Sequence, residues 1–231
     1  MTESPDRPNW PDNRAVADAF ASTLESNKID KPENKTKTLV MLSGGIDSVA
    51  VLVNLLTETD HIVHAHHIEL GNRDNRQQAE NDAVADVVDF CWQHYRDFSF
   101  STSKSDFKLT QRGYDLIFTM FHAGLVSISS VPGYDFVMTG HFQTKKIRAR
   151  YGQQMLDSCF LRESARPSWV RPLDALPHEK HVKIDIYRSV PDELAALSWS
   201  CRKPVTIEGE LTPCGRCYAC INLDVARGVP L

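Results

Sequence analysis

The sequence lacks several features that would assign it to common protein classes. No run approaches the ~18 to 20 consecutive apolar residues that a membrane-spanning helix requires. Residues 1–11 are polar and contain prolines, so we expect no secretion signal. The net charge of -4 provides no overall attraction to nucleic acid or to an anionic membrane. We therefore predict a cytoplasmic protein that has neither a membrane nor a nucleic-acid partner.

Two widespread nucleotide-binding motifs are missing as well. The sequence contains no Gly-x-x-x-x-Gly-Lys-Ser/Thr loop and no Gly-x-Gly-x-x-Gly fingerprint. It also contains no internal repeat and no low-complexity tract. These absences argue against a kinase-like or GTPase-like phosphate loop and against a dinucleotide site.

The apolar pattern alternates between short runs and longer amphipathic segments. The predicted strands cover residues 38–42, 62–68 and 134–139, and the predicted helices cover residues 15–27, 49–56, 75–95, 115–129, 183–189 and 191–197. At 231 residues and 42% hydrophobic composition, the chain can bury one full α/β core. The alternation predicts an α/β fold with an open, mostly parallel, doubly wound sheet and helices on both faces.

A glycine turn lies between the first predicted strand and the helix that follows it. The segment reads Leu42-Ser43-Gly44-Gly45-Ile46-Asp47-Ser48. Such a turn directs free backbone N–H groups and the positive end of a helix toward an anion, and the serines add hydroxyl donors. Asp47 would repel a phosphate unless a cation lies between them, so it implies Mg²⁺. The alternative interpretation is a tight strand-to-helix turn with a serine or aspartate cap.

Four of the six cysteines form the pattern C-x12-C-x2-C-x2-C near the end of the sequence. They are Cys201, Cys214, Cys217 and Cys220. Four thiolates at this spacing are typical of a closed structural Zn²⁺ site, which leaves no position for an activated water. An iron-sulfur cluster has the same ligand type and is the competing interpretation, and free buried cysteines are the simplest one. Cys91 and Cys159 stand alone and are interpreted as core residues.

The segment Ser43-Gly44-Gly45-x-Asp47-Ser48 resembles the hallmark of the PP-loop, or N-type ATP pyrophosphatase, superfamily. This resemblance implies an adenine nucleotide alpha hydrolase-like fold and cleavage of ATP between the α and β phosphates. Such enzymes form an adenylated substrate that a nitrogen or sulfur nucleophile attacks. The predicted nucleotide site comprises Leu42 to Ser48 together with Gly140, which ends the third predicted strand.

Within that superfamily, the C-terminal segment resembles the 7-cyano-7-deazaguanine synthase (QueC) family. The resemblance rests on Ser198-Trp199-Ser200-Cys201 and on Cys214-Gly215-x-Cys217-x-x-Cys220, with further similarity at 171–173 and 183–186. It implies ATP, Mg²⁺ and Zn²⁺ as cofactors, catalytic roles for Asp47, Ser48 and Lys183, and a homodimer. The implied reaction joins 7-carboxy-7-deazaguanine to ammonia and yields an amide and then the nitrile preQ0.

The segments that shape the substrate pocket in that family differ in this sequence. They are residues 69–73, 111–115 and 157–159. The difference leaves other acceptors open, such as a protein N-terminus or another amine. A tRNA-modifying sulfurtransferase of the same superfamily and a non-catalytic subunit that binds nucleotide and zinc are the remaining alternatives.

Two further groups of polar residues are candidates for a site. On a strand, His64 and His66 face one side and His67 the other, so a shared metal is not expected. The basic segment from Lys145 to Arg150 follows a predicted strand end and is either a flap over the site or a solvated face. We divide the chain into an N-terminal extension with a short helix (1–37), an ATP-binding α/β domain (38–190) and a zinc-binding region (191–231).

Overall fold

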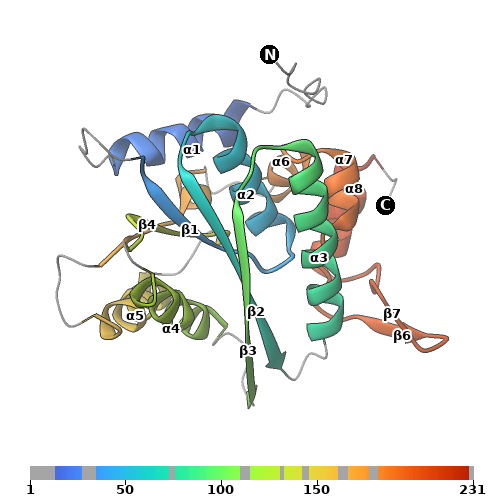
Figure 1. Cartoon of the computed structure of the whole chain (residues 1–231). Coiled ribbons are helices and arrows are strands. Elements are labelled where there is room, and N and C mark those ends of the chain that lie inside the picture. The colour runs from blue at the N-terminus through green and yellow to red at the C-terminus, as the bar shows by residue number, and fades with distance from the viewer. Residues whose placement is uncertain are drawn as a thin grey trace.

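Figure 1 shows the computed structural model of the chain, an α/β structure with a central parallel sheet. The structure describes residues 14–27, 35–72, 76–109, 115–130, 133–141, 146–160, 166–176 and 182–228. The predicted tail, and most of the predicted linker that follows the first helix, lie outside these residues. None of the described helices is long and apolar enough to cross a membrane.

The central sheet has five parallel strands in the order β3-β2-β1-β4-β5. The strands are β1 (Lys37–Met41), β2 (Ile62–Asn72), β3 (Ser99–Leu109), β4 (Phe136–Thr139) and β5 (Ser168–Val170). Because β1 lies in the middle, the strand order reverses between β1 and β4. In an open α/β sheet, ligands bind at such a switch point, beyond the carboxyl ends of the strands.

Helices cover both faces of this sheet, as the doubly wound prediction requires. They are α1 (Arg14–Ser26), α2 (Ile46–Glu58), α3 (Gln77–His94), α4 (Asp115–Ile128), α5 (Lys146–Ser158), the 3-10 helix η2 (Pro172–Ala175), α6 (Val182–Arg188), α7 (Asp192–Leu197) and α8 (Tyr218–Ala226). A hairpin of β6 (Val205–Ile207) and β7 (Glu210–Thr212) lies between the first two cysteines of the predicted cluster.

The two faces of the sheet have separate cores. The larger core packs α2, α3 and the C-terminal helices against one face, and the smaller packs α4 and α5 against the other. Helix α2 is buried on nearly all sides because its residues from Val49 to Val53 are apolar throughout. Burial of this kind supplies most of the stability of a helix. The start of α2 is therefore held firmly beside the end of β1.

The fold confirms the predicted class but corrects three details. The strand predicted at 134–139 is the fourth strand in chain order, because the sequence analysis missed β3. Residues 99–109 carry many serines and charged residues, which a predominantly apolar strand pattern does not detect. The short strand β5 was missed as well, and the unassigned stretch after Gly140 contains α5.

A candidate nucleotide-binding site

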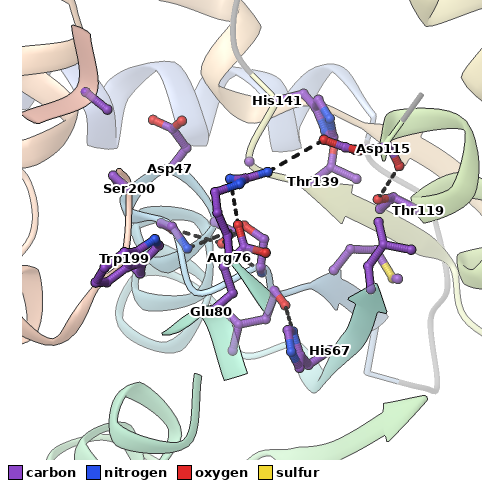
Figure 2. A pocket seen from close by; sticks show the side chains of 18 of the residues that line it. Asp47, His67, Arg76, Glu80, Asp115, Thr119, Thr139, His141, Trp199 and Ser200 are labelled. Atoms are coloured by element: carbon purple, nitrogen blue, oxygen red, sulfur yellow. Dashed lines mark hydrogen bonds and ion pairs between the residues drawn. The ribbon is translucent and has the colours of Figure 1, made fainter. Parts of the chain in front are cut away.

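A cavity of about 400 Å³ opens at the carboxyl ends of β1 and β4, at the switch point of the sheet. Its walls come from segments far apart in the sequence, as Figure 2 shows. They include the glycine turn before α2, the starts of α3 and α4, residues 139–141 at the end of β4, and the segment before the cysteines. A cavity of this size is typical of a small-molecule site.

The glycine turn forms the floor of the cavity and is held by its own serines. Ser48 Oγ accepts a hydrogen bond from Ser43 N at 3.1 Å and donates one to Gly45 O at 2.9 Å. The two serine hydroxyls lie 3.1 Å apart. No side chain caps α2 at its N-cap residue, Gly45. Several N–H groups of this turn are used locally, because Gly45 N donates to Ser43 Oγ and Ser48 N to Gly45 O. Asp47 and Ser48 line the cavity, so the positive end of the helix faces it, which suits an anion.

Two positions in this region have no room for a side chain and therefore require glycine. Gly44 adopts φ 76, and a Cβ placed there would lie 2.9 Å from Glu80 O. A Cβ on Gly140 would lie only 2.4 Å from Ser48 N. The end of β4 can therefore approach the start of α2 only because residue 140 lacks a side chain. This close approach brings the two strand ends of the switch point together.

Asp47 and Lys183 pair across the cavity. Lys183 Nζ donates a hydrogen bond to Asp47 Oδ2, and both side chains are about one-quarter exposed or less. The other oxygen, Asp47 Oδ1, is buried without a hydrogen-bond partner among the described residues. A buried carboxylate oxygen without a partner is costly, and Mg²⁺ prefers such hard oxygen ligands. The donor set at Asp47 thus fits the predicted cation.

The segment Trp199-Ser200, which we call the strap, binds directly to the glycine turn. Trp199 N donates to Gly44 O at 2.8 Å, and Ser200 Oγ accepts from Ile46 N at 3.2 Å. The indole nitrogen of Trp199 lines the cavity and, within the described part of the chain, has no hydrogen-bond partner. Cys201 follows the strap directly, so a displacement of the cysteine region would also move the two residues that are hydrogen-bonded to the glycine turn.

His141 supplies another buried polar atom at the cavity. Its Nδ1 has no partner among the residues that the structure describes. Burial, opposed by the Asp47 carboxylate, lowers the pKa of His141 to about 4. The imidazole is therefore neutral near pH 7. Together with Asp47 Oδ1 and Trp199 Nε1, this atom calls for a polar ligand, because each buried atom without a partner costs about 1–3 kcal/mol.

A charged cluster lies on the other side of the cavity, at the starts of α3 and α4 (Figure 2). Arg76 Nη1 lies 2.7 Å from Glu80 Oε1, and Arg76 Nη2 lies 3.9 Å from Asp115 Oδ2. Burial raises the pKa of Glu80, although the Arg76 guanidinium opposes this shift. Thr119 lines the same wall and donates to Asp115 O at 2.8 Å. We call these four residues the acceptor wall.

The thiols of the four cysteines that are predicted metal ligands converge on one point. The Sγ atoms of Cys201, Cys214, Cys217 and Cys220 all lie within 4.8 Å of one another. Thiolates bound to a single Zn²⁺ at about 2.3 Å lie roughly 3.8 Å apart in a tetrahedron. In a [4Fe–4S] cluster each of four thiolates binds a different iron, which holds the thiolate sulfurs farther apart. The arrangement therefore fits a single ion.

The electrostatics of the cysteine cluster are mixed, because burial raises the pKa of Cys201 and Cys220, whereas the pKa of Cys217 is lowered. Burial alone would raise the pKa of Cys217, but hydrogen bonds from the backbone N–H groups of Arg202 and Cys220 lower it to about 6. The Arg202 bond to Cys217 Sγ is 3.5 Å long. The thiolate is the form that binds a metal. Arg202 and two residues between the last two cysteines, Tyr218 and Ala219, also line the cavity.

The other candidate residues, the histidines of β2 and the basic residues of α5, do not come together in one site. His64 and His66 face one side of the sheet and His67 the other, as predicted, and no metal-like group of histidines occurs among the described residues. Lys146, Arg148 and Arg150 are exposed on α5 and do not line the cavity, so at these positions the basic segment is a solvated face. Lys145 lies outside the described residues.

The sequence analysis missed most of the acceptor wall. Arg76 and Glu80 lie in a predicted helix whose polar residues carry no distinctive motif. Asp115 was noted only within a segment that departs from the QueC pattern. His141 had one available signal, because it directly follows Gly140 at the carboxyl end of a predicted strand.

Comparison with known proteins identifies the fold. No protein-family model matches the sequence, and no curated protein is similar to it at a significant level. Among solved structures, the chain is similar to the U34-tRNA thiolase NcsA from Methanococcus maripaludis, determined with its [4Fe-4S] cluster. The two are 14% identical, the match covers 92% of this chain and 70% of that chain, and the TM-score is 0.53. At this level of identity the similarity establishes the fold alone.

Proposed function

We propose that this chain is an ATP-dependent enzyme of the PP-loop type that adenylates a carboxylate and passes the activated acyl group to ammonia. The observation that carries the proposal is Asp47 Oδ1, a buried carboxylate oxygen without a partner among the described residues. It lies at the start of α2, where the positive end of the helix meets the cavity. A polyphosphate accompanied by Mg²⁺ satisfies both features at once.

The residues of the glycine turn have distinct roles in this reaction. The carboxylate of the substrate attacks the α-phosphate, an acyl adenylate forms and pyrophosphate leaves. The amides at the start of α2, the Ser48 hydroxyl and Lys183 stabilise the charge that grows on the leaving pyrophosphate. Asp47 would hold Mg²⁺, and the ion would neutralise phosphate charge there. Ammonia then attacks the acyl carbon, so that the amide forms and AMP leaves.

The acceptor that we propose is 7-carboxy-7-deazaguanine, with the amide or the nitrile preQ0 as product. The proposal rests on the resemblance of the strap and the cysteine segment to the QueC family. A second adenylation, now of the amide oxygen, followed by loss of AMP would give the nitrile. The acceptor wall provides carboxylates and a guanidinium for a polar ring. An amine other than ammonia, such as a protein N-terminus, fits the same chemistry.

The distribution of thiols favours carbon-nitrogen ligation over transfer of sulfur from a cysteine. Four cysteines converge on one metal-sized space. Cys91 is fully buried, and burial raises the pKa of its thiol to about 12. Cys159 lies against Gly124 and is not among the residues that line the cavity. A cysteine that attacks a substrate must instead be accessible and have a low pKa.

Mass spectrometry of a reaction mixture tests the proposal. Purified protein is incubated with ATP, Mg²⁺, ammonium and 7-carboxy-7-deazaguanine. We expect AMP, pyrophosphate and either the amide or the nitrile. Formation of AMP only when a different amine is supplied would redirect the proposal to that acceptor. If none of the tested acceptors gives AMP, a nucleotide-binding subunit without catalysis becomes the better explanation.

A further inference from the structure

A continuous row of hydrogen-bonded side chains runs between β2, β3 and α4. This face of the sheet is covered by helices, where apolar side chains are the rule in parallel sheets. Instead, β3 carries a serine at every second position and β2 carries histidines beside them. From end to end the row contains Ser130, Tyr134, His64, Ser101, His66, Ser103, His122 and Ser105, and we call it the Ser/His row.

Each inner member of the row contacts both of its neighbours. Ser101 Oγ lies 2.7 Å from His64 Nε2 and 2.7 Å from His66 Nδ1. Ser103 Oγ lies 3.0 Å from His66 Nε2 and 3.3 Å from His122 Nδ1. The row ends on one side at Ser105 Oγ, 2.6 Å from His122 Nε2. On the other side His64 Nδ1 is hydrogen-bonded to the Tyr134 hydroxyl, which accepts from Ser130 at 3.1 Å.

The histidines of the row are oriented head to tail. Each presents Nδ1 toward the Tyr134 end and Nε2 toward the Ser105 end. Burial lowers the pKa of all three, that of His66 to about 4, so each ring is neutral near pH 7. A neutral imidazole has one donor and one acceptor nitrogen, and a hydroxyl has one proton.

Only two proton arrangements therefore satisfy every bond of the row. Either all three rings carry their proton on Nδ1, or all three carry it on Nε2. The two arrangements interconvert when a proton enters at Ser105 and each member passes its own proton to the next. The Tyr134 hydroxyl, which is partly exposed, then releases its own proton to water at the far end. The charge balances, and no member remains ionised.

The row lies against the wall of the cavity. His66 lines the cavity directly, and Ser105 pairs in register with Leu70, which also lines it. His122 lies about one helical turn beyond Thr119 of the acceptor wall. Tyr134 lies just before the start of β4, at the end of the sheet where the amino ends of the parallel strands lie, opposite the cavity. The row therefore connects the neighbourhood of the cavity with a distant part of the molecule.

We propose that the Ser/His row is a proton relay that carries a proton lost by the nucleophile in the cavity to the Tyr134 end of the sheet. This use of the row rests on the proposed function, in which ammonium must lose protons to form an amide. Water in the cavity accepts the first proton and delivers it to Ser105 Oγ. The row resets when its hydroxyls rotate and each ring exchanges its N–H proton with water, which returns the proton to Nδ1 before the next turnover.

Nitrogen NMR tests the relay without any need for catalysis. In ¹⁵N-histidine-labelled protein, the shifts of His64, His66 and His122 report which nitrogen carries the proton, once each ring is assigned by replacing it in turn. We expect all three rings to share one tautomer, or to exchange together between the two. Mixed tautomers within the row would overturn the proposal, whether or not the protein binds ATP.

Kinetics of Ser103 variants test the role of the row in turnover. Ser103→Ala interrupts the row, and we expect kcat to fall at least about tenfold, as for loss of a proton-transfer group, with unchanged ATP affinity and a smaller solvent deuterium isotope effect. Ser103→Thr keeps the hydroxyl and should restore both. Thr102→Ala, on the exposed opposite face of β3, is the matched control. Wild-type kcat and isotope effect in Ser103→Ala would contradict the relay.

Discussion

The cavity has two sides of unlike construction. On the phosphate side, the glycine turn and the strap are connected by backbone hydrogen bonds and short side chains, and residues more than 150 positions apart meet at 2.8 and 3.2 Å. On the acceptor wall, long charged side chains such as Arg76 and Glu80 determine the surface. Backbone geometry follows from the sheet topology, whereas charged side chains can change without changing the fold.

This difference predicts that the two sides can be damaged separately. Changes on the phosphate side should abolish ATP chemistry whatever the acceptor. Changes on the acceptor wall should leave ATP binding intact and alter only the use of the second substrate. A variant on the acceptor wall that weakened ATP binding, or a variant on the phosphate side that changed only the use of the acceptor, would contradict this division.

The largest effect is expected for Asp47→Ala. This change removes the proposed Mg²⁺ ligand and the hydrogen bond that Lys183 donates to Asp47. We expect AMP formation to fall about 10³-fold, because charge on the leaving pyrophosphate is no longer neutralised. Quantification of AMP by chromatography measures the effect. Asp86→Ala, an exposed position on α3, serves as control, and comparable AMP formation by the two variants would contradict the assignment.

Gly140→Ala should damage the phosphate side through its backbone. The added Cβ would lie 2.4 Å from Ser48 N, so β4 and α2 must move apart. We expect a loss of stability of about 3 kcal/mol, typical of overpacking, and weaker ATP binding. Thermal unfolding and calorimetry with ATP and Mg²⁺ measure these quantities. At Gly133, where the nearest atom to a Cβ is 4.0 Å away, the same substitution should change neither.

Cys214→Ser tests the connection between the metal centre and the phosphate side. Loss of one thiolate should empty the site, loosen Cys201 and release the strap from the glycine turn. We expect metal content to fall and ATP affinity to weaken on the order of tenfold, or about 1.4 kcal/mol. Cys159→Ser removes a thiol outside the cluster and should affect neither. If metal-free Cys214→Ser kept the wild-type affinity for ATP, the metal centre would not support the phosphate side.

Glu80→Gln should have the smallest effect, and only on the acceptor. It removes one charge from the acceptor wall and weakens the 2.7 Å contact with Arg76. We expect the KM for the acceptor to rise about fivefold, equivalent to about 1 kcal/mol, the usual net value of a hydrogen bond. ATP affinity should stay within twofold of the wild-type value. Asp82→Asn changes an exposed carboxylate on the same helix and is the control. A loss of ATP binding in Glu80→Gln would contradict the proposed division between the two sides of the cavity.

The sequence analysis predicted the fold and the position of the glycine turn, because local residue patterns determine both. An apolar run, two glycines and a buried helix specify β1, the turn and α2 without reference to the rest of the chain. The cysteine spacing likewise predicted the convergence of the four thiols. Strand β3 could not be predicted in this way, because its serines pair with histidines rather than pack in an apolar core.

The acceptor wall escaped prediction for a different physical reason. Arg76 and Asp115 precede or begin two helices that the sheet brings together across the cavity. Their proximity depends on tertiary structure, and neither residue type at a helix start is distinctive. The strap was recognised only through its resemblance to a family, and its contact with Gly44 required the structure.

Isotope transfer tests the central claim most directly. 7-Carboxy-7-deazaguanine with both carboxylate oxygens labelled with ¹⁸O is incubated with the protein, ATP, Mg²⁺ and ammonium, and AMP is analysed by mass spectrometry. If the carboxylate attacks the α-phosphate and AMP leaves with the bridging oxygen, the AMP must carry one ¹⁸O atom. Unlabelled AMP, or ADP in its place, would contradict adenylation of the carboxylate at this site.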